Sequence, residues 1–178
     1  LVAGATGKQG GATVDACLAK EGTFEVFALS RNPESPAAKA LVGKGVQVLK
    51  GDFTDKASLE AALKECKPAL VFLVTDFWNS AKQDEDTEFL HGANMIDAVN
   101  TVDPSIFFLF SSVGDADAVP PELHHFVSKS RIEKHLAESL QRWAVIRPGR
   151  CVYTCILTSI CLMQMIICTC RYLDNFDD

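Results

Sequence analysis

The chain has 178 residues, which is enough for one domain with a sizeable hydrophobic core. Apolar residues make up 48% of the sequence and charged residues 22%, a composition typical of a globular protein and not of a disordered segment. The net charge is −6 and the sequence contains no basic run, which argues against direct binding to nucleic acid.

A glycine-rich turn follows the first apolar residues. Leu1-Val2-Ala3 predicts the end of a buried strand, and residues 11–20 predict a helix. A strand, a glycine-rich turn and a helix in this order are typical of a site for a dinucleotide pyrophosphate, because glycines permit close backbone approach and helix N-termini attract phosphate. Here each glycine follows the previous one by three residues, in the pattern Gly-x-x-Gly-x-x-Gly, which is a variant of the usual fingerprint Gly-x-Gly-x-x-Gly. We therefore predict cofactor contacts from Gly4, Thr6, Gly7, Lys8, Gln9 and Gly10.

The second predicted strand, Phe24–Ser30, ends beside a cation. In dinucleotide folds an acidic residue at this place holds the ribose hydroxyls of NAD, whereas a cation accommodates the 2′-phosphate of NADP. Arg31 stands about 20 residues beyond the glycine turn, and its guanidinium suits bidentate contact with phosphate. An ordinary exposed arginine is the alternative. We favour NADP(H) over NAD(H) as the cofactor.

A third unit consists of a short helix, residues 37–42, and a strand, Val46–Lys50. Asp52 and Phe53 follow this strand, where a flat adenine can lie and where Asp52 can accept from its amino group. The same residues also fit a simple turn in which Thr54 or Asp55 caps the helix Lys56–Glu65. The two interpretations are compatible.

The apolar run Ala69–Thr75 predicts a central parallel strand that is covered on both faces. Thr75 and the loop after it are expected near the nicotinamide. Phe77 and Trp78 in this loop either stack on a ligand or pack as a lid or core.

The second half of the sequence continues the alternation of helices and strands. We predict a helix after the polar residues 80–86, a strand at Ile106–Ser112, a helix at His125–Leu140 and a strand at Ala144–Ile146. Phe126 is expected to support the core together with other apolar residues of its helix. This alternation predicts an α/β fold with a doubly wound parallel sheet of the Rossmann type.

Several ordered motifs resemble one family, the NmrA-like group of atypical short-chain dehydrogenases/reductases. These motifs are Val2-Ala3-Gly4-Ala5-Thr6-Gly7-Lys8-Gln9-Gly10, Ser30-Arg31-Asn32-Pro33, Gly51-Asp52-Phe53, Phe72-Leu73-Val74-Thr75, Ser111-Ser112-Val113 and His125-Phe126-Val127-Ser128-Lys129-Ser130-Arg131-Ile132-Glu133. The resemblance covers residues 1 to about 149, which we take as the dinucleotide-binding domain. It implies that the glycine turn and Arg31 bind the cofactor and that Lys129 lies near the nicotinamide ribose.

The resemblance also raises the question of catalysis. A typical member of the wider superfamily uses a Ser, a Lys and a Tyr four residues before the Lys, with the Tyr as general acid–base. Here Lys129 is present, Ser112 or its neighbour Ser111 fits the Ser, and His125 stands in the place of the Tyr. Imidazole transfers protons but differs from a phenol in acidity and shape. His125 equally fits an ordinary helix-start residue that faces solvent.

Two functions are compatible with a histidine in the place of the usual tyrosine. The first is an NADP(H)-binding sensor whose cofactor-dependent conformation is recognised by a protein partner such as a transcription regulator, a partner that the resemblance alone implies. The second is an NADP-dependent reductase acting on a small carbonyl or quinone substrate. The sparse cysteines of residues 1–149 indicate a reducing compartment, so we expect the cytoplasm or the nucleus.

Residues 150–178 form an apolar, cysteine-rich tail that holds five of the seven cysteines. Residues 151–170 carry no charge and reach the length of a membrane helix, but their Thr, Ser and Gln make a poor one, so membrane association is the less favoured interpretation. The cysteine spacing does not fit a metal site. Family members continue at this point with a substrate lobe. We therefore expect this lobe to be largely missing and the tail to come from an altered reading of the gene.

Overall fold

The computed structural model describes residues 1–78, 84–114, 120 and 122–148. In these ranges six strands alternate with five helices: β1 (Val2–Ala3), α1 (Lys8–Leu18), β2 (Phe27–Ser30), α2 (Pro36–Gly43), β3 (Gln47–Lys50), α3 (Lys56–Cys66), β4 (Leu70–Val74), α4 (Glu85–Val102), β5 (Phe107–Ser111), α5 (His124–Ser139) and β6 (Trp143–Ile146). The predicted cysteine-rich tail and the boundary before it lie outside these residues.

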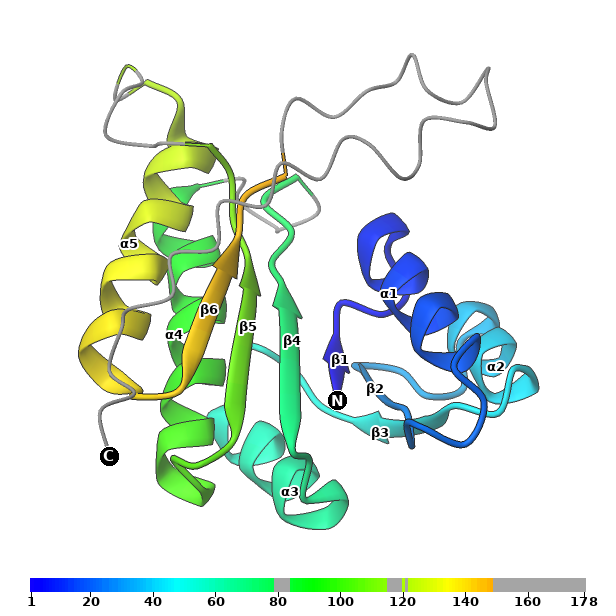
Figure 1. Ribbon diagram of the computed structural model, residues 1–178. Coiled ribbons are helices and arrows are strands. Elements are labelled where there is room, and N and C mark those ends of the chain that lie inside the picture. The colour runs from blue at the N-terminus through cyan, green and yellow to red at the C-terminus, as the bar shows by residue number, and fades with distance from the viewer. Residues whose placement is uncertain (79–83, 115–119, 121, 149–178) are drawn as a thin grey trace.

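The strands form one parallel sheet in the order β3-β2-β1-β4-β5-β6, which confirms the predicted Rossmann-type fold (Figure 1). Val2 of β1 pairs with Ala28 of β2 on one side and with Phe72 of β4 on the other. The strand order reverses between β1 and β4. Doubly wound sheets bind their ligands at the carboxyl ends of the strands beside such a reversal.

The helices cover the sheet on both faces. Helices α1 and α2 lie over β1 to β3, and α3, α4 and α5 pack together on the opposite face (Figure 1). A separate hydrophobic cluster fills each interface. On β5, Phe108 and Phe110 are fully buried under the second helix layer, whereas Leu109 points to the first, as the two-residue period of a strand requires.

Two predicted boundaries were wrong. Helix α1 begins at Lys8 and not at residue 11, because Gly7 already occupies the N-cap position with an extended backbone. Strand β2 begins at Phe27 and not at Phe24, whose side chain is exposed. The residues from Phe24 to Val26 precede the strand.

The N-termini of the helices differ in how they are capped. Ser35, Asp55 and Asp84 cap α2, α3 and α4 through their side chains, so the predicted cap at Asp55 is confirmed. Helices α1 and α5 have Gly7 and Leu123 at their N-cap positions, without a side-chain cap. Both of these helices start at the carboxyl edge of the sheet, where their N-termini are available to a ligand.

Within the described ranges, no helix is both long enough and apolar enough to span a membrane. The uncharged segment 151–170 lies outside those ranges.

Candidate functional site

The glycine turn between β1 and α1 is built on close backbone contacts. Gly4 has a φ of +92°, and a Cβ at this position would lie 2.8 Å from the carbonyl oxygen of Val74. A Cβ on Gly10 would lie 2.2 Å from the carbonyl oxygen of Gly4. Only glycine fits at either position, since an added Cβ would push the turn away from β4 or helix α1 away from the turn.

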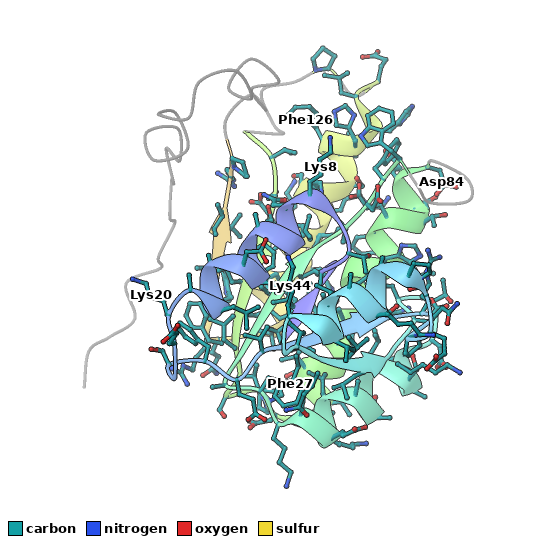
Figure 2. The ribbon with its side chains drawn as sticks, turned by 90° about the vertical axis from the view of Figure 1, so that its right-hand side faces the viewer. Lys8, Lys20, Phe27, Lys44, Asp84 and Phe126 are labelled. Atoms are coloured by element: carbon teal, nitrogen blue, oxygen red, sulfur yellow. The ribbon has the colours of Figure 1, made fainter. Side chains whose placement is uncertain are left out.

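The first turn of α1 is open to solvent. The backbone N–H of Gly7 donates to the carbonyl of Gly4 at 3.0 Å, which closes the loop. Thr6, Lys8 and Gln9 are exposed around it. Figure 2 shows Lys8, Asp84 and Phe126 toward the end of the molecule at which the strands terminate, with Lys20 and Phe27 toward the other. A pyrophosphate can therefore reach the N-terminus of α1 from the carboxyl edge of the sheet.

Arg31 and Asp52 lie at the ends of β2 and β3. Arg31 is exposed. Asp52 accepts from the backbone N–H and the hydroxyl of Thr54 at 2.9 and 2.8 Å, the predicted turn. The Thr54 N–H is the largest cause that holds the pKa of Asp52 below its ordinary value, and the charge of Arg31 adds to it. The Asp52 carboxylate thus stays ionised, and it remains able to accept from an adenine amino group.

Helix α4 contributes two residues to this end of the site that the sequence analysis missed. The ring of His91 lies 6.0 Å from the ring of Phe53, and the Asn94 amide donates to the Phe53 carbonyl at 2.7 Å. Burial lowers the pKa of His91, which favours the neutral imidazole. Nothing local marks either residue, because the contact joins segments 41 residues apart.

Lys129, on α5, lies in a buried polar network at the end of β4. Its ammonium donates to the Thr75 hydroxyl at 2.8 Å and lies 3.0 Å from Oε1 of Glu88. The Thr75 hydroxyl donates to the same Oε1 at 2.7 Å, and the Ser128 hydroxyl donates to Oε2. The structure thus brings the predicted Thr75 and Lys129 together. Glu88 was missed, because three other acidic residues surround it at the start of α4 and hide its special position.

Ser112 follows β5 at the same edge of the sheet. Its predecessor Ser111 pairs with Val74, the residue before Thr75. The Ser112 N–H donates to the carbonyl of Ile146, but its buried hydroxyl has no hydrogen-bond partner in the described part of the chain. Such an orphan is rare, and a water or a ligand can supply the partner.

His125 lies in an aromatic cluster formed by Phe77, Trp78, His125 and Phe126. Its ring is 5.9 Å from Phe77, 5.3 Å from Trp78 and 4.7 Å from Phe126. The expectation that Phe126 supports the core was wrong, since Phe126 is only partly buried, belongs to neither hydrophobic cluster, and has its ring tilted against His125 at the uncapped start of α5. His125 is half-buried, unlike the exposed His124. Among the described residues, no hydrogen bond links His125 or Ser112 to Lys129, so their catalytic roles stay predictions.

The residues present fit a dinucleotide. Glycines let the turn pack closely on β4 and on helix α1, the helix has no side-chain cap at its exposed first turn, and an orphaned hydroxyl lies at the same edge of the sheet.

A family model described as the NmrA-like family matches residues 1–163. The chain belongs to the NmrA-like family. This confirms the resemblance drawn from the motifs. The match runs past residue 149, where the predicted domain ends, and the domain boundary at that residue stays a prediction.

NmrA-like relatives of this chain include named oxidoreductases. An NmrA-like family domain-containing oxidoreductase of Aspergillus versicolor is 35% identical over 147 residues, which are 78% of this chain and 39% of the relative. Quinone oxidoreductase 2 of Escherichia coli is 26% identical over 148 residues, 83% of this chain and 47% of that protein. The chain therefore spans two fifths to about half the length of these relatives.

Solved structures share the fold of this NmrA-like chain. The NADPH-dependent quinone oxidoreductase of E. coli, complexed with NADPH, superimposes with a TM-score of 0.68 at 25% identity, over 83% of this chain and 48% of that one. Triphenylmethane reductase of Citrobacter sp. gives a TM-score of 0.72 at 22% identity, over 87% of this chain and 50% of that one, a likeness of fold alone.

Proposed function

We propose that this chain is the NADP(H)-binding part of an NmrA-like oxidoreductase that reduces a small quinone or other conjugated carbonyl compound. The observation that carries the proposal is the exposed Arg31 at the end of β2, on the same sheet edge as the glycine turn. The NADPH-dependent E. coli quinone oxidoreductase, at 25% identity, supports both the cofactor and the substrate class.

Each end of the site would hold a different part of the cofactor, which supplies the hydride when bound. The glycine turn would hold the pyrophosphate, and Arg31 the 2′-phosphate. Asp52 and Phe53 would flank the adenine. Lys129, held by Thr75, would lie beside the nicotinamide ribose, and the orphaned Ser112 hydroxyl would donate to the substrate oxygen.

The aromatic cluster supports a flat, conjugated substrate. Trp78 is 62% exposed, whereas Phe77 beneath it is buried. His125 of this cluster lies one helical turn before Lys129 on α5, and Phe77 and Trp78 follow Thr75 after β4, so the cluster adjoins the predicted nicotinamide position. Aromatic faces bind a planar ring by offset or edge contacts, and a small aliphatic carbonyl compound cannot make such contacts.

Calorimetric titration of the full chain with NADPH and with NADH tests the cofactor assignment. Arg31→Ala should raise the Kd for NADPH about 10- to 100-fold, because a charge-assisted hydrogen bond to phosphate contributes about 1.5–3 kcal/mol. The Kd for NADH, which lacks the 2′-phosphate, should change little. Lys20→Ala is the control, since Lys20 is exposed and lies toward the opposite end of the molecule (Figure 2). An equal rise in the Kd for NADPH and the Kd for NADH in Arg31→Ala would contradict the proposal.

A second candidate is the cofactor sensor, and one observation favours it. In the described part of the chain the Lys129 ammonium is held by Glu88 and Thr75 and makes no hydrogen bond to His125, so nothing there activates His125 as an acid. In this case NADP(H) would shift the chain toward a conformation that a protein partner, such as a transcription regulator, recognises. The cofactor must then bind the two conformations with different affinities.

Turnover of NADPH with 1,4-benzoquinone separates the two candidates. A rate above background that Lys129→Ala abolishes would favour the reductase. Tight NADPH binding with no turnover would favour the sensor.

A further inference from the structure

Two charged side chains are buried in the described part of the chain, and they contact each other. Glu88 on α4 has no exposed surface, and Lys129 on α5 is 9% exposed. An unpaired buried charge costs several kcal/mol, and even a well-made buried pair often contributes no more than apolar side chains would. Stability alone therefore does not explain this pair, which lies at the carboxyl edge of the sheet beside Thr75.

The carboxylate of Glu88 is fully engaged by three neighbours, one that follows β4 and two on α5. Oε1 accepts from the Thr75 hydroxyl after β4 and pairs with the Lys129 ammonium, while Oε2 accepts from the Ser128 hydroxyl. Because the Thr75 hydroxyl gives its proton to Glu88, its oxygen is directed to accept from Lys129 at 2.8 Å. Glu88 thus orients both partners at once.

The ammonium of Lys129 keeps one weak contact. Two of its hydrogens go to the Thr75 hydroxyl at 2.8 Å and to Glu88 at 3.0 Å. Its remaining contact, to the Thr75 carbonyl, is 3.4 Å long and is the one most readily exchanged. An incoming ribose hydroxyl can replace this carbonyl while the other two bonds keep the ammonium in place.

The other carboxylates at this end of α4 have different partners. Glu85 and Asp86 lie against Arg131, and Glu85 also lies 3.4 Å from His124. Among the residues that the structure describes, Glu88 is the carboxylate that pairs with Lys129.

We propose that Glu88 is a positioning residue for the nicotinamide half of NADP(H), which it serves by fixing the Lys129 ammonium and the Thr75 hydroxyl at the site. This inference rests on the proposed function, since it presumes that the cofactor binds at this edge. It predicts that the loss of Glu88 weakens the binding of the whole cofactor but not the binding of its adenosine end.

The test compares NADPH with adenosine 2′,5′-bisphosphate, which lacks the nicotinamide ribose, by titration of the full chain. Glu88→Gln keeps the size of the side chain and should raise the Kd for NADPH about 10-fold, the size expected when one charge-assisted hydrogen bond is lost. The Kd for the bisphosphate should stay within about twofold. Lys129→Met should give the same pattern, and the double variant should be no weaker than either single variant, because both act on the same contact.

Two further variants keep the test decisive. Asp97→Asn is the matched control, since Asp97 also lies on α4 and pairs with His135 on α5, but nine residues beyond Glu88 and away from the carboxyl edge, and it should leave both Kd values unchanged. If Glu88→Gln fails to fold, Glu88→Asp is the alternative, because it keeps the charge but shortens the side chain by one methylene. It should weaken the binding of NADPH and leave the binding of the bisphosphate unchanged.

The outcomes are distinct. If Glu88→Gln weakened the binding of NADPH and of the bisphosphate equally, this would indicate general disruption and overturn the positioning role. An unchanged Kd for NADPH would overturn it too. So would a double variant in which the Kd increases of the two single variants multiply. A folded wild-type chain that binds neither ligand would overturn the proposed function and this inference together.

Discussion

At the scale of single residues, the site depends on places where a side chain is absent as much as on places where one is present. Gly10 lies against the backbone of the glycine turn, whereas Arg31 and Lys129 contribute charge at opposite ends of the site. The places of the glycines and of Arg31 at the ends of their strands could be predicted from the sequence, because they follow from local spacing after a strand, and their contacts with the cofactor stay predictions. The contact of Glu88 with Lys129 could not, because it joins two helices that are far apart in the sequence.

Gly10→Ala should damage both stability and cofactor binding. The new Cβ would lie 2.2 Å from the oxygen and 2.6 Å from the carbonyl carbon of Gly4, which are backbone atoms without rotamers to relieve the clash. Helix α1 must then shift away from the turn, which we expect to lower the free energy of unfolding by about 1–3 kcal/mol and to weaken NADPH binding more than about 10-fold. Urea denaturation and calorimetric titration measure the two effects.

Gly11→Ala is the matched control for this prediction. A Cβ on Gly11 would lie 3.5 Å from the carbonyl oxygen of Ala5, an ordinary contact, and alanine is favoured over glycine inside a helix by about 1 kcal/mol. This variant should therefore fold at least as stably as the wild type. Equal effects at the two positions would show that the close approach at Gly10 does not matter.

At the scale of elements, sequence patterns predicted which helices and strands form better than where each of them begins. The runs of apolar residues and the turns between them predicted each strand and helix that the structure describes, because those patterns are local. The start of α1 was missed because it depends on the backbone conformation of Gly7. The placement of His91 and Asn94 beside Phe53 depends on how α4 crosses α3, which no local pattern encodes.

Asp55→Ala should destabilise the chain through helix α3. The Asp55 carboxylate accepts from the N–H groups of Ala57 and Ser58 at 3.1 and 3.3 Å, and removal of such a cap costs about 0.5–2 kcal/mol. The comparison is Asp15→Ala, which breaks an ion pair with Lys44 at 2.6 Å between two exposed side chains and should cost about 0–1 kcal/mol. Chemical denaturation gives both values. A larger loss in the free energy of unfolding for Asp15→Ala than for Asp55→Ala would mean that the cap contributes less to stability than the surface ion pair.

At the scale of the whole molecule, the site joins two halves of one sheet. The glycine turn, Arg31 and Asp52 belong to the half built from β1, β2 and β3, whereas Thr75 and Lys129 belong to the half that begins with β4. The halves meet where β1 pairs with β4 through the two residues of β1. A ligand that contacts both halves therefore bridges the junction between them.

NADPH should stabilise the full chain against thermal unfolding. A ligand at about 100 times its Kd adds about 2.7 kcal/mol to the free energy of unfolding, which corresponds to a rise in Tm of about 5–10 °C for a domain of this size. NADH at the same concentration should give a smaller rise, and in Arg31→Ala the difference between the two cofactors should disappear, because that difference comes from the 2′-phosphate. Differential scanning fluorimetry with each cofactor measures these shifts. If adenosine 2′,5′-bisphosphate at the same multiple of its own Kd raised the Tm as much as NADPH does, this would agree with the linkage relation, in which stabilisation depends on occupancy alone. A rise with the bisphosphate well below that with NADPH would instead show that one half unfolds alone while the other still binds the adenosine end, an unfolding that only a ligand contacting both halves suppresses.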